Sequence, residues 1–191
     1  LDCITISKKQ LEFAKKRIFT AGLNEKVDIK FLDYRDVKGQ YDSIASIEMI
    51  EAVGEKYLNK YFSMIKNNLK PSGIGAIQAI IIKDELFNQY RKNEDFIQKY
   101  IFPGGFLPSL QSIKDHTKNS GLQLTGYNSY GIHYSNTLKK WRENFINSWT
   151  DISKQGFDQS FKKIWDFYFS YCEAGFKSKN IDLIQFSLYN K

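Results

Sequence analysis

The chain is poor in several features that would narrow its class at once. Its 191 residues include two cysteines and two histidines, with no Cys-x-x-Cys pair. Two cysteines cannot form a disulfide framework, so a reducing cytoplasm is the simplest setting. The two histidines and two cysteines are too few and too isolated in the sequence to predict a metal site. No apolar run approaches the roughly 20 residues of a membrane span, and the start does not resemble a signal peptide.

Positive charge is present but not concentrated. The formal net charge is +7, from 28 Lys and Arg against 21 Asp and Glu, spread over both halves. This dispersal predicts no nucleic-acid partner and is compatible with loose attraction to an anionic membrane surface. Aromatic residues make up 16% of the chain. They suit a protein that surrounds a large apolar ligand, or simply an aromatic core.

Strand and helix patterns alternate in the first half. A helix opens with the capping-box pattern Ser7-Lys8-Lys9-Gln10, and a second is predicted over Glu55–Leu69. The strand patterns are Cys3–Ile6, Val27–Leu32, Tyr41–Ile47 and Ile74–Ile82. This order predicts an α/β fold with a parallel sheet between helices, its long strand Ile74–Ile82 being buried on both faces.

The second half begins with a segment of different character. Residues 83–108 are polar and then apolar, ending in Phe102-Pro103-Gly104-Gly105. We predict that 83–108 is a lid or insertion within a single domain over 1–191; a surface helix and loop is the simpler alternative. Beyond it the pattern predicts helices over 109–120, 135–149 and 158–176, and strands over 123–130 and 181–189.

Short motifs follow one another along the whole chain. They are Thr5-Ile6-Ser7 with Gln10, Asp33–Asp36, Ile47–Gly54, Tyr100–Gly105, Gly131–Tyr134 with Thr137, Leu138 and Trp141, and Tyr171-Cys172. Together they resemble the cyclopropane-fatty-acyl-phospholipid synthase family. The resemblance implies a Rossmann-like class I methyltransferase dependent on S-adenosylmethionine. No G-x-G-x-G occurs, and the chain opens in a strand pattern without Met. We therefore expect the first strand and glycine-rich loop of that fold to lie upstream.

The resemblance also assigns cofactor-binding residues. Thr5, Ser7 and Gln10 would border the ribose and adenine, since hydroxyls at a helix start can bond a ribose. Asp33 and Tyr34 would lie at the adenine. Helix capping is an equal alternative for Ser7, and a turn role is an alternative for Asp33.

Catalytic roles are implied in the same way. Glu51 and Tyr134, with Gln78 and the backbone of Ile80, would hold a bicarbonate ion that acts as the base. A glutamate interacting with a helix dipole is the alternative for Glu51. Many relatives carry His where Gln78 stands, and Gln cannot titrate. Cys172 matches a family cysteine often proposed as catalytic, although its apolar helix face suggests a buried, inert thiol.

The implied reaction adds a methylene group to the cis double bond of an unsaturated phospholipid acyl chain. A carbocation would form, and aromatic faces stabilise cations. We expect some of the following to line an acyl tunnel: Tyr100, Phe102, Phe106 and Tyr168. The predicted protein is cytoplasmic, associates peripherally with membranes and can form a homodimer. Two alternatives are an N-methyltransferase of a small amine and a non-catalytic module that binds lipid surfaces.

Overall fold

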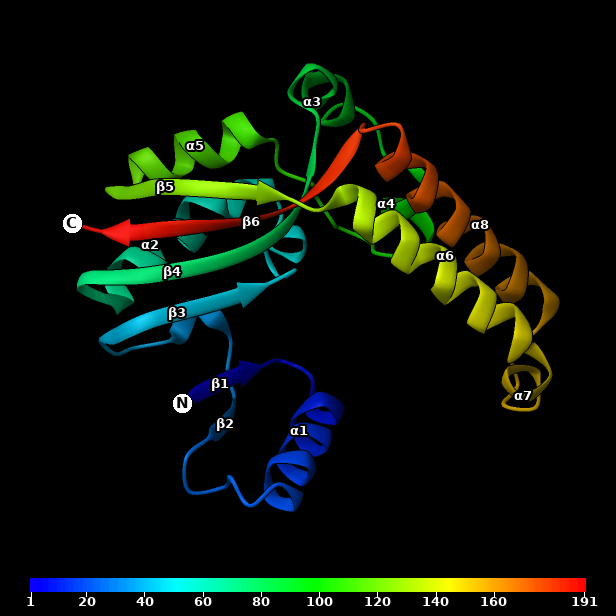
Figure 1. Ribbon diagram of the computed structural model, residues 1–191, viewed down its shortest axis with the longest axis horizontal. Coiled ribbons are helices and arrows are strands. Elements are labelled where there is room, and N and C mark those ends of the chain that lie inside the picture. The colour runs from blue at the N-terminus through cyan, green and yellow to red at the C-terminus, as the bar shows by residue number, and fades with distance from the viewer.

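The strands of the protein form two separate sheets in a computed structural model that describes residues 1–191 (Figure 1). The first sheet pairs β1 (Asp2–Thr5) with β2 (Asp28–Phe31) in parallel. The second has the order β3 (Tyr41–Ile47), β4 (Leu69–Ile82), β6 (Ile181–Asn190), β5 (Leu122–Ser129). β1 and β3 are not paired with each other; the Tyr41 hydroxyl donates to the Asp2 carboxylate at 3.1 Å.

The four-stranded sheet is mixed: the strands of the first half of the chain pair in parallel, as predicted, and β6 adds antiparallel pairs. β3 and β4 are parallel, joined by a crossover through α2 (Leu58–Asn68). β6 is antiparallel to both of its neighbours. The reason lies in the connection: α6 (Gly131–Asn147) leaves the sheet where β5 ends, and α8 (Gln159–Lys177) returns to the same end. A strand that re-enters at that end must run in the opposite direction.

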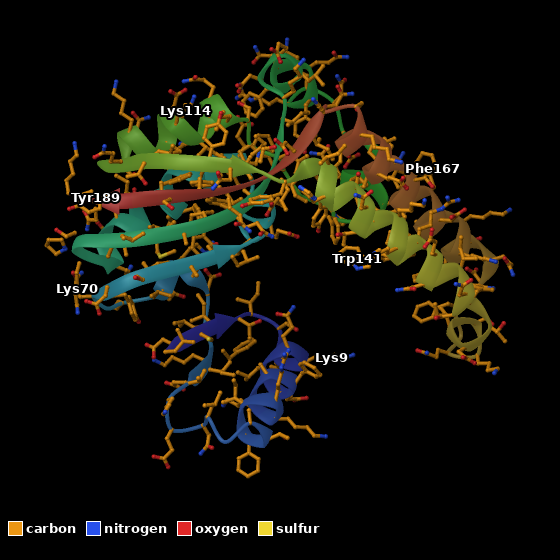
Figure 2. The ribbon with its side chains drawn as sticks, viewed as in Figure 1. Lys9, Lys70, Lys114, Trp141, Phe167 and Tyr189 are labelled. Carbon is orange, nitrogen blue, oxygen red and sulfur yellow. The ribbon has the colours of Figure 1, made fainter.

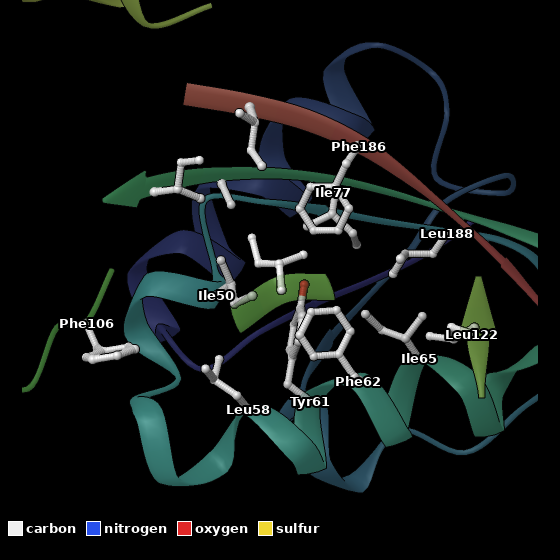
Figure 3. Close-up of a cluster of buried hydrophobic side chains, with 14 of the residues drawn as sticks. Ile50, Leu58, Tyr61, Phe62, Ile65, Ile77, Phe106, Leu122, Phe186 and Leu188 are labelled. Atoms are coloured by element: carbon white, nitrogen blue, oxygen red, sulfur yellow. The ribbon is translucent and has the colours of Figure 1, made fainter. Parts of the chain in front are cut away.

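The main core lies between one sheet face and the helices α2 and α5 (Leu110–Asn119). Alternate residues of β4 enter it, namely Ile77, Ala79 and Ile81, as the period of two in a strand requires. Tyr61, Phe62 and Ile65 of α2 have no exposed surface and meet Leu188 of β6 (Figure 3).

A second, smaller core lies on the opposite sheet face. It joins Leu138 of α6 and Phe169 and Phe176 of α8 to Leu183 of β6. The helical pair extends beyond the sheet as an arm, so it covers only part of this face (Figure 1). Ile74, in the first half of β4, is therefore 51% exposed, and the prediction that this strand is buried on both faces is wrong there.

The remaining helices are short, except for α1 beside the two-stranded sheet. They are α1 (Lys8–Thr20), η1 (Tyr34–Asp36), η2 (Ile50–Ala52), η3 (Glu55–Tyr57), α3 (Asp84–Tyr90), α4 (Phe96–Tyr100) and α7 (Trp149–Ser153). The predicted Ser7 cap is confirmed, because its hydroxyl accepts from the Gln10 N–H at 3.3 Å. None of the helices combines the length and apolar character that a membrane crossing requires.

Candidate active site

Residues far apart in the sequence meet at the carboxyl ends of β3 and β4, beside the start of α6 (Figure 1). Glu48 directly follows β3, and Glu51 lies in η2. Gln78 is near the end of β4, and Tyr134 is in the first turn of α6. The carboxyl ends of parallel strands are the usual place for ligands in open α/β sheets. We therefore take this cluster as the candidate site.

Glu51 is held in a largely apolar position. Its Oε1 accepts from the Ile80 N–H at 2.5 Å, whereas its Oε2 is buried without a hydrogen-bond partner. Burial, with a smaller contribution from the negative charge of Glu48, raises the pKa of Glu51 to about 7. A proton on Oε2 is consistent with this geometry, because a neutral carboxyl needs fewer partners than a carboxylate.

Glu48 is the functional candidate that sequence reasoning missed. Its carboxylate accepts from Gln78 Nε2 at 2.7 Å and from the Tyr134 hydroxyl at 3.2 Å. Its backbone has a φ of 49°. The spacing Glu48-x-x-Glu51 after a strand was the available signal, because two carboxylates three residues apart can share one turn.

A partner strand orients the Gln78 side chain. Gln185 of β6 lies opposite Gln78 in the antiparallel register, and its Nε2 donates to Gln78 Oε1 at 2.8 Å. With its oxygen engaged, Gln78 presents its NH₂ group to Glu48. The order of donation is thus Gln185 to Gln78 to Glu48.

Aromatic rings support this cluster from the arm. The Tyr134 ring packs 5.0 Å from that of Phe176 and 6.0 Å from that of Trp141. Burial raises the Tyr134 pKa, and Glu48 adds to the shift. The start of α6 is tightly fixed, because the Gly131 N–H donates to Asp182 at 2.8 Å.

Only some of the predicted tunnel residues lie at the site. Tyr168 and Phe102 form an edge-to-face pair with centroids 6.1 Å apart. Tyr168 packs against the second core together with Tyr134. Burial raises the pKa of Tyr168, with Cys172 and then Glu48 adding to the shift. Phe106 packs in the main core with Phe87 and Tyr90. That some of the four residues line an acyl tunnel stays a prediction.

The segment 83–108 is anchored over Glu51. The Phe106 N–H donates to the Glu51 carbonyl at 2.8 Å. Gln98 donates to the Gly105 carbonyl at 3.0 Å, and the Leu107 N–H donates to the Tyr90 hydroxyl at 3.0 Å. These contacts place the loop directly on the site; that it acts as a lid stays a prediction.

Comparison with known proteins gives this arrangement a family. The family model for mycolic acid cyclopropane synthetase matches residues 2–186. The chain belongs to this family. The tuberculostearic acid methyltransferase UfaA1 of Mycobacterium tuberculosis is 42% identical over 97% of the chain, and the Escherichia coli cyclopropane-fatty-acyl-phospholipid synthase 34% over 95%. The chain spans 44% and 45% of the length of these two relatives.

The solved structures of the synthetase family share the fold. The mycolic acid cyclopropane synthase CmaA1, complexed with SAH and CTAB, superposes with a TM-score of 0.88 at 23% identity. It covers 99% of this chain, which covers 69% of that protein. The α/β methyltransferase-like fold expected from the sequence is confirmed.

The predicted cofactor residues of this family member gather at the carboxyl ends of β1 and β2. The Thr5 hydroxyl donates to Gln10 Oε1 at 2.7 Å and accepts from the Ser7 N–H at 3.1 Å. Asp33 accepts from the Arg35 side chain at 2.6 and 2.9 Å, which lowers the pKa of Asp33 to about 2. Oδ1 also accepts from the Arg35 N–H at 2.9 Å, so Oδ2 is the oxygen that keeps a lone pair for an amine. The set therefore fits the polar groups of S-adenosylmethionine.

The predicted bicarbonate residues do not fit that ion as arranged. The structure brings Glu51, Gln78, Ile80 and Tyr134 together, but the Ile80 N–H, the Tyr134 hydroxyl and one N–H of Gln78 already donate to a protein carboxyl group. An added anion would lie beside the Glu48 carboxylate, which like-charge repulsion opposes.

Two other features take no part in the hydrogen bonds of the cluster. Burial raises the pKa of the Cys172 thiol to about 12, which keeps it from forming a thiolate. Its packing is against the second core, as expected for an inert cysteine. A cleft of about 490 Å³ runs between η1 and α2, lined by Arg35, Lys38 and Lys60 among others. None of the candidate catalytic residues lines it.

Proposed function

We propose that the protein transfers a methyl group from S-adenosylmethionine to the cis double bond of an unsaturated phospholipid acyl chain and forms a cyclopropane ring. The observation that carries the proposal is the half-buried cluster of Glu48, Glu51 and Tyr134 at the carboxyl ends of β3 and β4. The synthetase family, and relatives named for acyl-chain methylation, support the same chemistry.

The reaction needs three things from the protein. S-adenosylmethionine, when bound, supplies an electrophilic methyl carbon. As one alkene carbon bonds to it, the sulfur–methyl bond breaks, the sulfonium becomes a neutral thioether and the other alkene carbon becomes a cation. The protein must stabilise this cation, exclude water and take a proton from the new methyl group.

The cluster has groups suited to each requirement. The faces of Tyr168 and Phe102 can stabilise positive charge. The loop 101–107 covers Glu51 and limits water. Carboxylates beside the developing cation stabilise it electrostatically and can accept a proton.

Exposed aromatic residues on the arm favour a lipid substrate. Trp141 of α6 and Phe167 of α8 are 45% and 52% exposed, and both lie on the arm, far from Lys70 and Tyr189 (Figure 2). Phe167 packs edge-to-face on Phe96 of α4, with centroids 4.6 Å apart. This surface suits peripheral contact with a cytoplasmic membrane face, where an acyl chain can be taken up.

The test uses the complete polypeptide that contains these residues. It is incubated with methyl-labelled S-adenosylmethionine and vesicles of unsaturated phospholipid, and the lipids are examined by mass spectrometry. We expect label in acyl chains one methylene heavier. Label on head groups, or on an added amine, would overturn the proposal in favour of N-methylation.

The Glu51→Gln variant tests the site itself. We expect turnover to fall by about 100-fold, because the carboxylate acts on the transition state. Cofactor binding by calorimetry should change little, since Glu51 is placed near the reacting carbon and not at the ribose. Glu12→Gln, on the exposed surface of α1, is the matched control. Equal losses of binding and turnover in Glu51→Gln would contradict the assigned role.

A further inference from the structure

Glu48 is held in a backbone conformation that glutamate rarely adopts. Its φ of 49° lies in the left-handed region, which favours glycine. Such conformations cost of order 1 kcal/mol and cluster at functional sites. The Glu48 N–H donates to the Gln78 carbonyl at 2.9 Å, so the strained residue is also tied to β4.

The strained conformation delivers the carboxylate to two donors. Gln78 Nε2 lies 2.7 Å from one oxygen and the Tyr134 hydroxyl 3.2 Å from the other. Both Gln78 and Tyr134 are among the side chains that were predicted from the sequence to bind bicarbonate. A carboxylate and a bicarbonate share a planar pair of acceptor oxygens, so one can take the place of the other.

The charges around the cluster point the same way. All nine salt bridges lie elsewhere, and neither Glu48 nor Glu51 has a basic partner. A second anion beside Glu48 would therefore gain no basic side chain, and it could receive the Tyr134 hydrogen bond only in place of the existing carboxylate. With no basic side chain to offset negative charge, the site favours a single charged proton acceptor, and Glu48 is that group.

We propose that Glu48 is a built-in base, which holds the place of a bound bicarbonate and accepts the proton in the methyl-transfer reaction. The inference rests on the proposed function. A C–H bond of the new methyl group breaks, its electron pair closes the three-membered ring onto the cationic carbon, and the proton passes to the Glu48 carboxylate. The neutral acid then returns the proton to solvent. No further reactant is needed.

The first experiment reads binding without turnover. The complete polypeptide is titrated with ¹³C-labelled bicarbonate in the presence of S-adenosylhomocysteine, and line broadening is followed by NMR. We expect no saturable binding to the native protein or to Glu12→Gln. Glu48→Gly should bind bicarbonate, because it frees Gln78 and Tyr134. Saturable binding to the native protein, or none to Glu48→Gly, would overturn the inference.

The variant is expected to fold, because glycine adopts a φ of 49° without strain. Its melting temperature should equal or exceed that of the native protein. Glu48→Gln keeps the size of the side chain and removes its charge. This second variant separates loss of the base from the opening of a space.

The second experiment reads turnover. In buffer stripped of carbon dioxide, native activity should stay within about twofold of that with added bicarbonate. Glu48→Gln should lose about 100-fold in either buffer, whereas Glu48→Gly should lose as much and recover with bicarbonate. Native activity that requires bicarbonate would overturn the inference. If the native protein labels no acyl chain, the proposed function fails, while the NMR titration still decides whether Glu48 holds the anion position.

Discussion

Residues 1–36 and residues 41–191 both alternate strands with helices, yet only the second region builds a core. In the first, Ile29 is the one buried residue, and α1 has none. In the second, α2 alone buries five residues against four strands and α5. A strand–helix–strand unit makes its hydrogen bonds locally, but burial requires neighbours on every side. Both regions therefore form regular secondary structure, but only residues 41–191 gain the stability that a buried core provides.

A matched pair of Phe→Ala substitutions, one in each region, should give the largest difference in stability. Phe62 has no exposed surface, whereas Phe13 of α1 is 69% exposed. Phe62→Ala should lower the free energy of unfolding by about 3–5 kcal/mol, because it leaves a cavity in the main core. Phe13→Ala should change it by less than about 0.5 kcal/mol. Urea unfolding measures both, and similar losses would mean that α1 packs in solution.

The two regions also contain carboxyls whose pKa values are shifted in opposite directions. Arg35 lowers the pKa of Asp33 to about 2, so its contribution to stability is present above the unfolded value of 3.8 and lost as pH falls toward 2. The pKa of Glu51 is raised to about 7 from 4.5. The native state then binds the proton more tightly, so stability falls as pH rises between these two values.

Glu51→Gln should remove this second dependence. The native protein should lose up to about 3 kcal/mol of unfolding free energy between pH 4.5 and pH 7, relative to the variant. Denaturant melts of both proteins across that range measure it. Parallel pH profiles would show that Glu51 is solvated and its pKa ordinary.

Glycine substitutions compare two places within the second region. A Cβ added at Gly131 would lie 2.4 Å from Asp182 Oδ1 and 3.2 Å from Phe176, whereas one added at Gly126 meets nothing within 4 Å. Gly131→Ala should cost about 1–3 kcal/mol by overpacking and shift Tyr134 away from Glu48. Gly126→Ala, on β5, should be nearly neutral. Thermal unfolding of the pair is the test, and equal melting temperatures would contradict it.

The smallest effect concerns the link between the two sheets. Tyr41→Phe removes the exposed hydrogen bond to Asp2 and should cost less than about 1 kcal/mol. Amides of β1 and β2 should then exchange faster with deuterium, while those of β4 and β6 keep their protection. Slower exchange in β4 than in β1 is expected even in the native protein. Uniform protection would mean that the sheets are coupled by more than this bond.

Local chemistry explains what could be predicted. The Ser7 cap, the helix over 109–120 and the return strand near 181–189 depend on patterns within one turn or one strand, and the structure contains them. The direction of β6 could not be read in this way, because a period of two is the same for either direction. The exposure of Ile74 depends on how far the α6–α8 arm extends, which no strand pattern encodes.

The site, too, has residues that could be predicted from the sequence and one that depends on distant parts of the fold. The resemblance named Glu51, Gln78 and Tyr134, and the structure brings them together. Glu48 escaped notice because its role depends on a left-handed φ and on the orientation of a glutamine side chain set from another strand. Neither property is visible in one sequence segment.

The pairing of Gln185 with Gln78 has a consequence for the order of assembly. β6 enters the sheet between β4 and β5, and about a hundred residues separate the two glutamines along the chain. Pairing over such a distance is slow, because the entropy cost of closing the loop comes before the stabilising contacts form. During synthesis, β3, β4 and their glutamates emerge long before the residue that turns the amide toward them. The hydrogen-bond chain from Gln185 to Gln78 to Glu48 can therefore form only after β6 has been inserted into the sheet.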